Sequence, residues 1–276
     1  FTLGVGNYSE ADVREGARAF SGIRIQAVDA SGTPVAYGRR KGATPQQYLQ
    51  QLNALIAQGV TFRGRVVPRQ HDDGTKTYLG HTGSLGPEEA IDAILAQDAC
   101  APYIATKALT YFAVPQPSSS LVQSVASQFR GSRYDIRTLM RAIFRSDDFR
   151  AAAAYRSLVR SPADYMVAVM RATGERDLST AAVQAGAGMD QILFDPPTVG
   201  GWPGNAGWIS SSAVLARMNF AQAVVNRGGT LPDATQAVHT HLDNVVSADT
   251  AAVFNASQTN SDRWYAVLSS PEFHLK

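Results

Sequence analysis

Cysteine is nearly absent from this chain of 276 residues, in which Cys100 is the only one. A single thiol excludes an intrachain disulfide and any zinc site built from cysteines. Long hydrophobic runs are missing too, and none approaches the ~20 residues that a membrane-spanning helix needs. Charged residues make up 17% of the chain and hydrophobic residues 45%, a balance that excludes intrinsic disorder and indicates a globular protein.

Lysine is scarce as well: four of the 25 basic residues are lysine and the other 21 are arginine. Codon bias in a GC-rich genome explains such an excess as readily as a charged partner does. The net charge of +2 is small, and no nucleic-acid-binding motif with interleaved aromatic residues occurs, so we expect no nucleic-acid partner.

Catalytic and cofactor signatures are also missing. The chain has no GxSxG elbow, no HExxH pair, no phosphate-binding P-loop and no GxGxxG after a predicted strand. The sequence therefore predicts neither a cofactor nor a metal, and leaves open whether the protein is an enzyme.

Hydrophobic periodicity predicts a mainly α-helical fold, a bundle-like domain of many helices with a small β hairpin or ribbon near residues 60–80. We expect one domain over residues 1–276, with sub-regions 1–85 (a helix plus the ribbon) and 86–276 (a helical body). In the first helix, 10–20, Ser9 and Asp12 form a capping box, and Val13, Ala17 and Phe20 face inward. Further helices are expected at 162–173, 179–194, 209–227 and 259–269.

The stretch RQHDDGTKTYLGHTG, residues 69–83, concentrates polar residues. Asp73-Gly74 is a strong signal for a two-residue hairpin turn, which would pair His71 with Lys76 on one face. A histidine beside a lysine stays neutral and can act as a base. His71 as base, Asp72 orienting it and Lys76 as an electrostatic stabiliser would make a hydrolase-type site. The alternative is a structural hairpin with a polar turn.

A glycine-rich loop carries two of the three tryptophans, in DPPTVGGWPGNAGW at 195–208. Trp202 and Trp208 are candidates for an aromatic platform that binds a sugar or a peptide. The alternative is that both indoles cap the helical core, with the glycines fitting around them.

Four arginines recur every four residues: Arg133, Arg137, Arg141 and Arg145. This spacing places them on one helical face, opposite Ile136, Met140 and Ile143, where like charges cost about 0.2–0.5 kcal/mol per pair. Either an acidic partner neutralises this face, which makes the four arginines candidates for partner binding, or it is a solvated face balanced by nearby aspartates.

Several motifs occur together in order: FTLGVGNYSEADVREGARAF, the HD-G-K-LG core of RQHDDGTKTYLG, TKALTYF, SPADYMVAVMRATG, FDPPTVGGWPGNAGWISSSAVLARMNF and LSSPEF. Through them the chain resembles the bacterial domain of unknown function 1800 family, from its first residue to nearly its last. Members are usually longer, so the chain resembles the C-terminal portion of one.

The resemblance implies little chemistry, because no activity is firmly attached to that family. It implies an exported, periplasmic protein, and as partner a sulfatase-like protein (domain of unknown function 1501) encoded nearby. Arg18 matches an arginine that recurs in the family, which makes it a candidate for ligand binding or for a buried ion pair. We therefore expect a binding or assembly component that acts with this partner.

Overall fold

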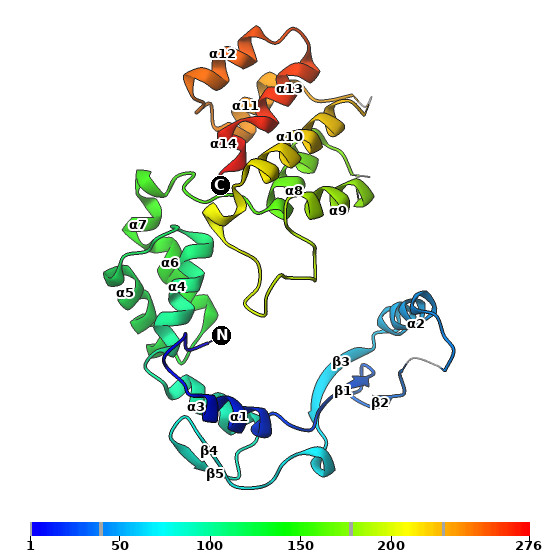
Figure 1. Ribbon diagram of the computed structural model, residues 1–276, viewed down its shortest axis with the longest axis vertical. Helices are drawn as coiled ribbons and strands as arrows, with labels where there is room; N and C mark the ends of the chain where they lie inside the picture. The colour runs from blue at the N-terminus through cyan, green and yellow to red at the C-terminus, as the bar shows by residue number, and fades with distance from the viewer. Residues whose placement is uncertain (1, 39–40, 177–178, 228–229) are drawn as a thin grey trace. The chain divides into compact units, whose positions relative to one another are not determined.

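The protein is mainly α-helical, as predicted, in a computed structural model that describes residues 2–38, 41–176, 179–227 and 230–276 (Figure 1). The chain forms two compact units: an N-terminal unit, Thr2–Cys100, and a C-terminal unit, Ala101–Lys276. Within the described residues, no helix has the length and apolar character needed to cross a membrane.

Over its described residues, 2–38 and 41–100, the N-terminal unit combines three α-helices with two small sheets. Its elements are α1 (Glu10–Ala19), β1 (Ile23–Val28), β2 (Pro34–Val35), α2 (Pro45–Ala57), β3 (Thr61–Val66), the 3-10 turn η1 (Pro68–Gln70), β4 (Lys76–Tyr78), β5 (His81–Gly83) and α3 (Pro87–Ala96). β1 lies between β2 and β3 and is antiparallel to both, from Ile23 opposite Val66 to Val28 opposite Thr61. α2 joins β2 to β3 beyond the end of this ribbon (Figure 1).

Helix α1 begins as predicted and turns a different face inward. Ser9 caps it, and the side chain of Asp12 closes the capping box. Val13, expected inside, is 57% exposed, and the buried residues are Gly16 and Ala19. The ring of Tyr78 packs against this face: a Cβ on Gly16 would lie 3.0 Å from that ring, closer than Cβ atoms normally come, so glycine favours the close approach.

The prediction that Asp73-Gly74 forms the hairpin turn is wrong. β4 pairs with β5 through Lys76 opposite Gly83 and Tyr78 opposite His81, so the two turn residues are Leu79 and Gly80. Both have positive φ, 48° and 84°, as a type I′ turn requires. Asp73-Gly74 is not a hairpin turn, and His71 is not paired with Lys76.

In its described residues, the C-terminal unit consists of helices and connecting segments, with two isolated β-bridges, Val159 to Leu275 and Thr198 to Gly201. The helices are α4 (Cys100–Phe112), α5 (Ser119–Gly131), α6 (Ile136–Arg145), α7 (Asp147–Arg150), η2 (Ala152–Ala154), α8 (Pro162–Thr173), α9 (Ser179–Gly188), η3 (Asn205–Trp208), α10 (Ser211–Val225), α11 (Ala234–Leu242), α12 (Ala248–Ala256), α13 (Asn260–Ser269) and α14 (Pro271–His274). The prediction for 162–173 is confirmed, with Ser161 as N-cap and Gly174 in the left-handed region at its end. α9 ends at Gly188, six residues before the predicted 194.

Two hydrophobic cores hold this unit together. One lies between α4, α5 and α6 and includes Leu109, Phe129 and Ile143. The other is built mainly from α8, α10, α11 and α13 and includes Tyr165 and Trp264. Each helix buries one side, so the other sides and the loops are left to form sites.

Candidate functional site

Arg18 and Asp72 form the centre of the polar cluster in the N-terminal unit. The Arg18 guanidinium donates to both carboxylate oxygens of Asp72, from Nε to Oδ2 at 2.8 Å and from Nη2 to Oδ1 at 3.1 Å. Its Nη1 donates to Oε2 of Glu15 at 2.6 Å. The hydrogen bond from Arg18 lowers the pKa of Asp72 to about 2. An ion pair is therefore present at Arg18, but it is half-buried and not buried as expected, since 33% of the Arg18 side chain and 38% of the Asp72 side chain are exposed. Asp72 is a carboxylate engaged in structure.

Lys76 holds the loop of residues 72–76 together from its buried side. Its side chain is 1% exposed, and its ammonium donates to the backbone carbonyl oxygens of Asp72 and, at 3.0 Å, of Gly74. The backbone N–H of Gly74 in turn donates to Oδ1 of Asp72 at 2.9 Å. Residues 72–76 thus form a loop folded around its own lysine, which is why Asp73-Gly74 makes no hairpin.

His71 faces a different neighbour. Its Nδ1 lies 3.0 Å from the backbone oxygen of Ser21, and the hydroxyl of Ser21 accepts from the backbone N–H of Asp72 at 2.8 Å. In the described part of the chain, no hydrogen bond joins the imidazole to Asp72 or Lys76. The structure brings Arg18, Asp72 and Lys76 together in a way that fits the structural alternative, and the catalytic roles for His71, Asp72 and Lys76 stay a prediction.

The arginine face of α6, defined here as Arg137, Arg141 and Arg145, is exposed along its whole length, and Arg133 in the preceding loop is exposed too. Among the residues that the structure describes, no ion pair involves any of the four. The buried side of the helix carries Leu139 and Ile143.

The inward side of α6 is narrower than predicted. Ile143 is buried, but Ile136 is 59% exposed, and Phe144 is 42% exposed. Phe144 stacks edge-on with Phe149 at 5.0 Å and with Phe112 of α4 at 6.2 Å between ring centroids. An apolar stripe of exposed Ile136, half-buried Met140 and exposed Phe144 therefore runs along α6 beside its arginines.

Trp202 and Trp208 line one pocket of about 570 Å³ in the C-terminal unit. Trp208 lies in η3 and is buried, while Trp202 is half-buried in the loop before it. The Nε1 of Trp202 is shielded from solvent and has no acceptor in the described ranges. Tyr111 of α4 adds a third aromatic side chain and is 61% exposed.

An ion pair crosses the wall of this pocket. Lys276 Nζ lies 2.5 Å from Oδ2 of Asp164, and 5.1 Å from the centroid of the Tyr111 ring. Burial opposes ionisation of Asp164, but the hydrogen bond and charge of Lys276 and the hydrogen bonds from Ser161 together outweigh it and lower the pKa of that carboxyl. Gln191 accepts from the backbone N–H of Ala163 at 2.8 Å, so its amide NH₂ is left as a donor.

The sequence pointed to the tryptophans of this pocket and to none of its other residues. Asp164 has a local signal, since it completes the capping box of Ser161 at the start of α8. Tyr111 and Lys276 have no local signal. Lys276 reaches the pocket through antiparallel pairing of residues 158–160 with 274–276, which are far apart in sequence.

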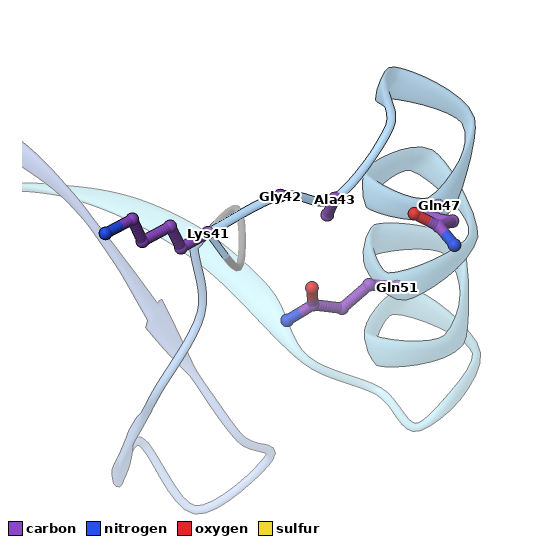
Figure 2. A pocket seen from close by; sticks show the side chains of 5 residues that line it. All are labelled: Lys41, Gly42, Ala43, Gln47 and Gln51. Atoms are coloured by element: carbon purple, nitrogen blue, oxygen red, sulfur yellow. The ribbon is translucent and has the colours of Figure 1, made fainter.

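A second hollow lies in the N-terminal unit, beside α2. It measures about 510 Å³, and Figure 2 shows Gln51 reaching from the helix toward the loop that carries Lys41. Its walls are polar and hold no aromatic ring; they are Lys41, Gly42, Ala43, Gln47 and Gln51. In the described ranges of both units, no group of three or more His, Cys, Asp or Glu side chains is placed to bind a metal ion.

Comparison with known proteins places the chain by family. One family model matches residues 1–275, and its description reads "Protein of unknown function (DUF1800)". No curated protein and no solved structure matches the chain. The match covers the sites described above except Lys276, which lies one residue beyond it.

Proposed function

The chain belongs to the DUF1800 family, and from that premise we propose that the protein is a binding component that docks an acidic partner protein on the arginine face of α6. One observation carries the proposal: an apolar stripe lies beside an arginine stripe that forms no ion pair with any residue the structure describes. The pKa of Asp135, the N-cap of the helix, is lowered mainly by hydrogen bonds from Thr138 and in part by the charge of Arg137.

Helical geometry shows how close the stripes are. At 3.6 residues per turn, successive residues are about 100° apart, so Ile136, Met140 and Phe144 span about 80° of the helix surface. The arginines begin about 20° beyond Phe144 and span about another 80°. A partner helix with apolar residues on one side and acidic residues along its flank matches both stripes at once.

The charges on α6 carry a cost when the protein is alone. Arg137–Arg141 and Arg141–Arg145 are two like-charged pairs at i,i+4 spacing, at about 0.2–0.5 kcal/mol each. Acidic side chains of a partner would remove this repulsion and speed association. Since exposed single ion pairs contribute little, the exposed Ile136 and Phe144 are the anchors and the arginines select the partner.

The family resemblance supplies the first partner to test, the exported sulfatase-like protein encoded nearby. Binding between the two full-length proteins should be measured by calorimetry at low and high salt. The double substitution Arg137→Glu/Arg141→Glu should weaken the complex about tenfold or more, and salt should weaken the wild-type complex.

The matched control is Arg63→Glu/Arg65→Glu, which reverses two exposed arginines on β3 of the N-terminal unit. It should leave the affinity unchanged. Absence of any complex between the complete proteins contradicts the proposed partner, and a complex that tolerates the α6 reversal contradicts the proposed surface.

A further inference from the structure

The Trp202 pocket is defined here by Tyr111, Asp164, Trp202, Trp208 and Lys276 and lies in the same unit as the arginine face. Its geometry points to a binding site for a neutral oligosaccharide, a proposal that does not depend on the arginine face. The pocket's volume of about 570 Å³ is within the range of small-molecule sites, about 300–1,000 Å³.

The aromatic side chains define what kind of surface the ligand must offer. Tyr111 is largely exposed and Trp202 partly so, and both are rigid rings that contribute large contact areas at low entropic cost. A pyranose ring offers a flat face of C–H groups that packs on such rings, with its hydroxyls around the rim.

The polar groups of the pocket match hydroxyls. A hydroxyl both donates and accepts, and the pocket offers both roles close together. Lys276 and the backbone N–H of Ser161 both bind Oδ2 of Asp164, which leaves Oδ1 as an acceptor. The amide NH₂ of Gln191 is a donor, and the hydroxyls of Thr106 and Thr110 also line the pocket. The Thr106 hydroxyl donates to the carbonyl oxygen of Pro102 at 2.8 Å, so it is left as an acceptor.

The charges nearest the aromatic rings favour a neutral ligand. Lys107, a further cation of the lining, is exposed to solvent, and its ammonium lies over the ring of Tyr103, 5.2 Å from the centroid. The ammonium of Lys276 lies between Asp164 and the Tyr111 ring, so its charge is already compensated within the protein. A cationic ligand would compete with that ammonium for both partners, and an anionic ligand would have to draw it away from Asp164. A neutral polyol uses the pair as it stands, because the pair presents a donor and an acceptor side by side.

A proline-rich peptide is the main competing occupant, since aromatic grooves also bind polyproline II segments. Such a segment offers carbonyl acceptors and lacks N–H donors at its prolines. It would leave the Asp164 carboxylate unmatched when it desolvated the pocket, a cost that a sugar hydroxyl avoids.

The buried, unpaired N–H of Trp202 favours a movement of its loop when a ligand binds. An unpaired buried donor costs about 1–3 kcal/mol. A ligand hydroxyl that reached this N–H after a small shift of the loop would give it the acceptor it lacks. Trp264, the third tryptophan, already donates its N–H to the carbonyl oxygen of Pro232 at 2.7 Å in the core, so a fluorescence change reports on the pocket.

The test is a glycan array of neutral and acidic oligosaccharides probed with the full chain, followed by fluorescence titration with the best-bound glycan and with a hexaproline peptide. We expect a neutral glycan to bind, with affinity more than about tenfold lower in Tyr111→Ala. Tyr111 is exposed, so this variant should fold. Tyr8→Ala, an exposed tyrosine of the N-terminal unit, is the control and should bind normally.

Three outcomes with the wild-type chain would overturn the assignment. They are an array without any bound glycan, a preference for acidic glycans, and binding of hexaproline in place of sugar. Asp164→Asn is the second variant: it keeps the size of the side chain and should weaken glycan binding by removing the compensation of Lys276. Equal affinity of Asp164→Asn, Tyr111→Ala and wild type would place any glycan binding elsewhere.

Discussion

His274 is the residue through which this structure predicts a measurable response to pH. It is buried at the end of α14, and its ring stacks edge-on against Tyr165 at 5.1 Å between centroids. Burial lowers the pKa of His274 to about 4, and the nearby charges of Arg217 and Arg160 act in the same direction. A hydrogen bond to the backbone of Leu268 opposes them only in part.

The sign of the effect follows from which state binds the proton. In the unfolded chain His274 takes up a proton near pH 6.5, whereas the folded protein resists it until about pH 4. The unfolded state therefore binds more protons in this window, and stability falls as the pH falls. A difference between 6.5 and about 4 implies a loss of about 2 kcal/mol by pH 5 and about 3 kcal/mol by pH 4.

The assay is urea unfolding of wild type and His274→Phe at steps between pH 7 and pH 4. Phenylalanine keeps an aromatic ring against Tyr165 and removes the titration. Other groups titrate in both proteins, so the difference in unfolding free energy between the two isolates His274. As the pH falls from 7 to 4, wild type should lose about 3 kcal/mol more unfolding free energy than the variant.

An exposed histidine supplies the control. His239 of α11 lies in the same unit, and His239→Phe should show a pH dependence close to that of wild type. If the difference between wild type and His274→Phe is flat from pH 7 to pH 4, then burial does not suppress the charge of His274 and the reasoning is refuted.

Three further outcomes test the N-terminal unit. Lys76→Met should destabilise it by about 2 kcal/mol or more, measured by urea unfolding, because two loop carbonyls lose a charged donor. Gly22→Ala should lower the free energy of unfolding by more than about 1 kcal/mol, because a Cβ there would lie 2.8 Å from the backbone nitrogen of His71. Gly32 also has positive φ but faces open space, so Gly32→Ala should lower that free energy by less. Asp72→Asn should remove a loss of stability that wild type shows as the pH falls from about 4 toward 2, because only the ionised carboxylate pairs with Arg18; an unchanged acid-unfolding curve would contradict this.

Local signals in the sequence can predict helix starts, as the capping box of Ser9 and Asp12 did for α1. Ser9, Asp135 and Ser161 cap their helices because each bonds to a backbone N–H three residues on, within one segment of chain. The inward faces were harder, as the exposed Val13 and Ile136 show. Periodicity identifies an apolar side, but which part of that side is covered depends on the shape of a neighbour that is distant in sequence.

The hairpin shows how long-range contacts override a local preference. Asp-Gly is the stronger turn signal, yet the turn forms at Leu79-Gly80. Arg18 takes the carboxylate of Asp72, and Asp12 accepts a hydrogen bond from the backbone N–H of Leu79 at 2.9 Å, which holds that residue in its left-handed conformation. Both partners lie in the first helix, more than fifty residues away in sequence, so no local rule could select the turn.

The Trp202 pocket depends on a register that sequence patterns cannot supply. The backbone N–H of Lys276 donates to the oxygen of Leu158 at 2.7 Å, and the N–H of Arg160 donates to the oxygen of His274 at 2.9 Å. A slip of one residue in this pairing would direct Leu275 instead of Lys276 toward Asp164, since neighbouring side chains in an extended segment point to opposite faces. The aromatic rings would remain, but Asp164 would lose its cation and the pocket would no longer favour a neutral ligand. The tryptophans were predictable because they are conspicuous in one loop, whereas the selectivity of the pocket comes from two segments more than one hundred residues apart.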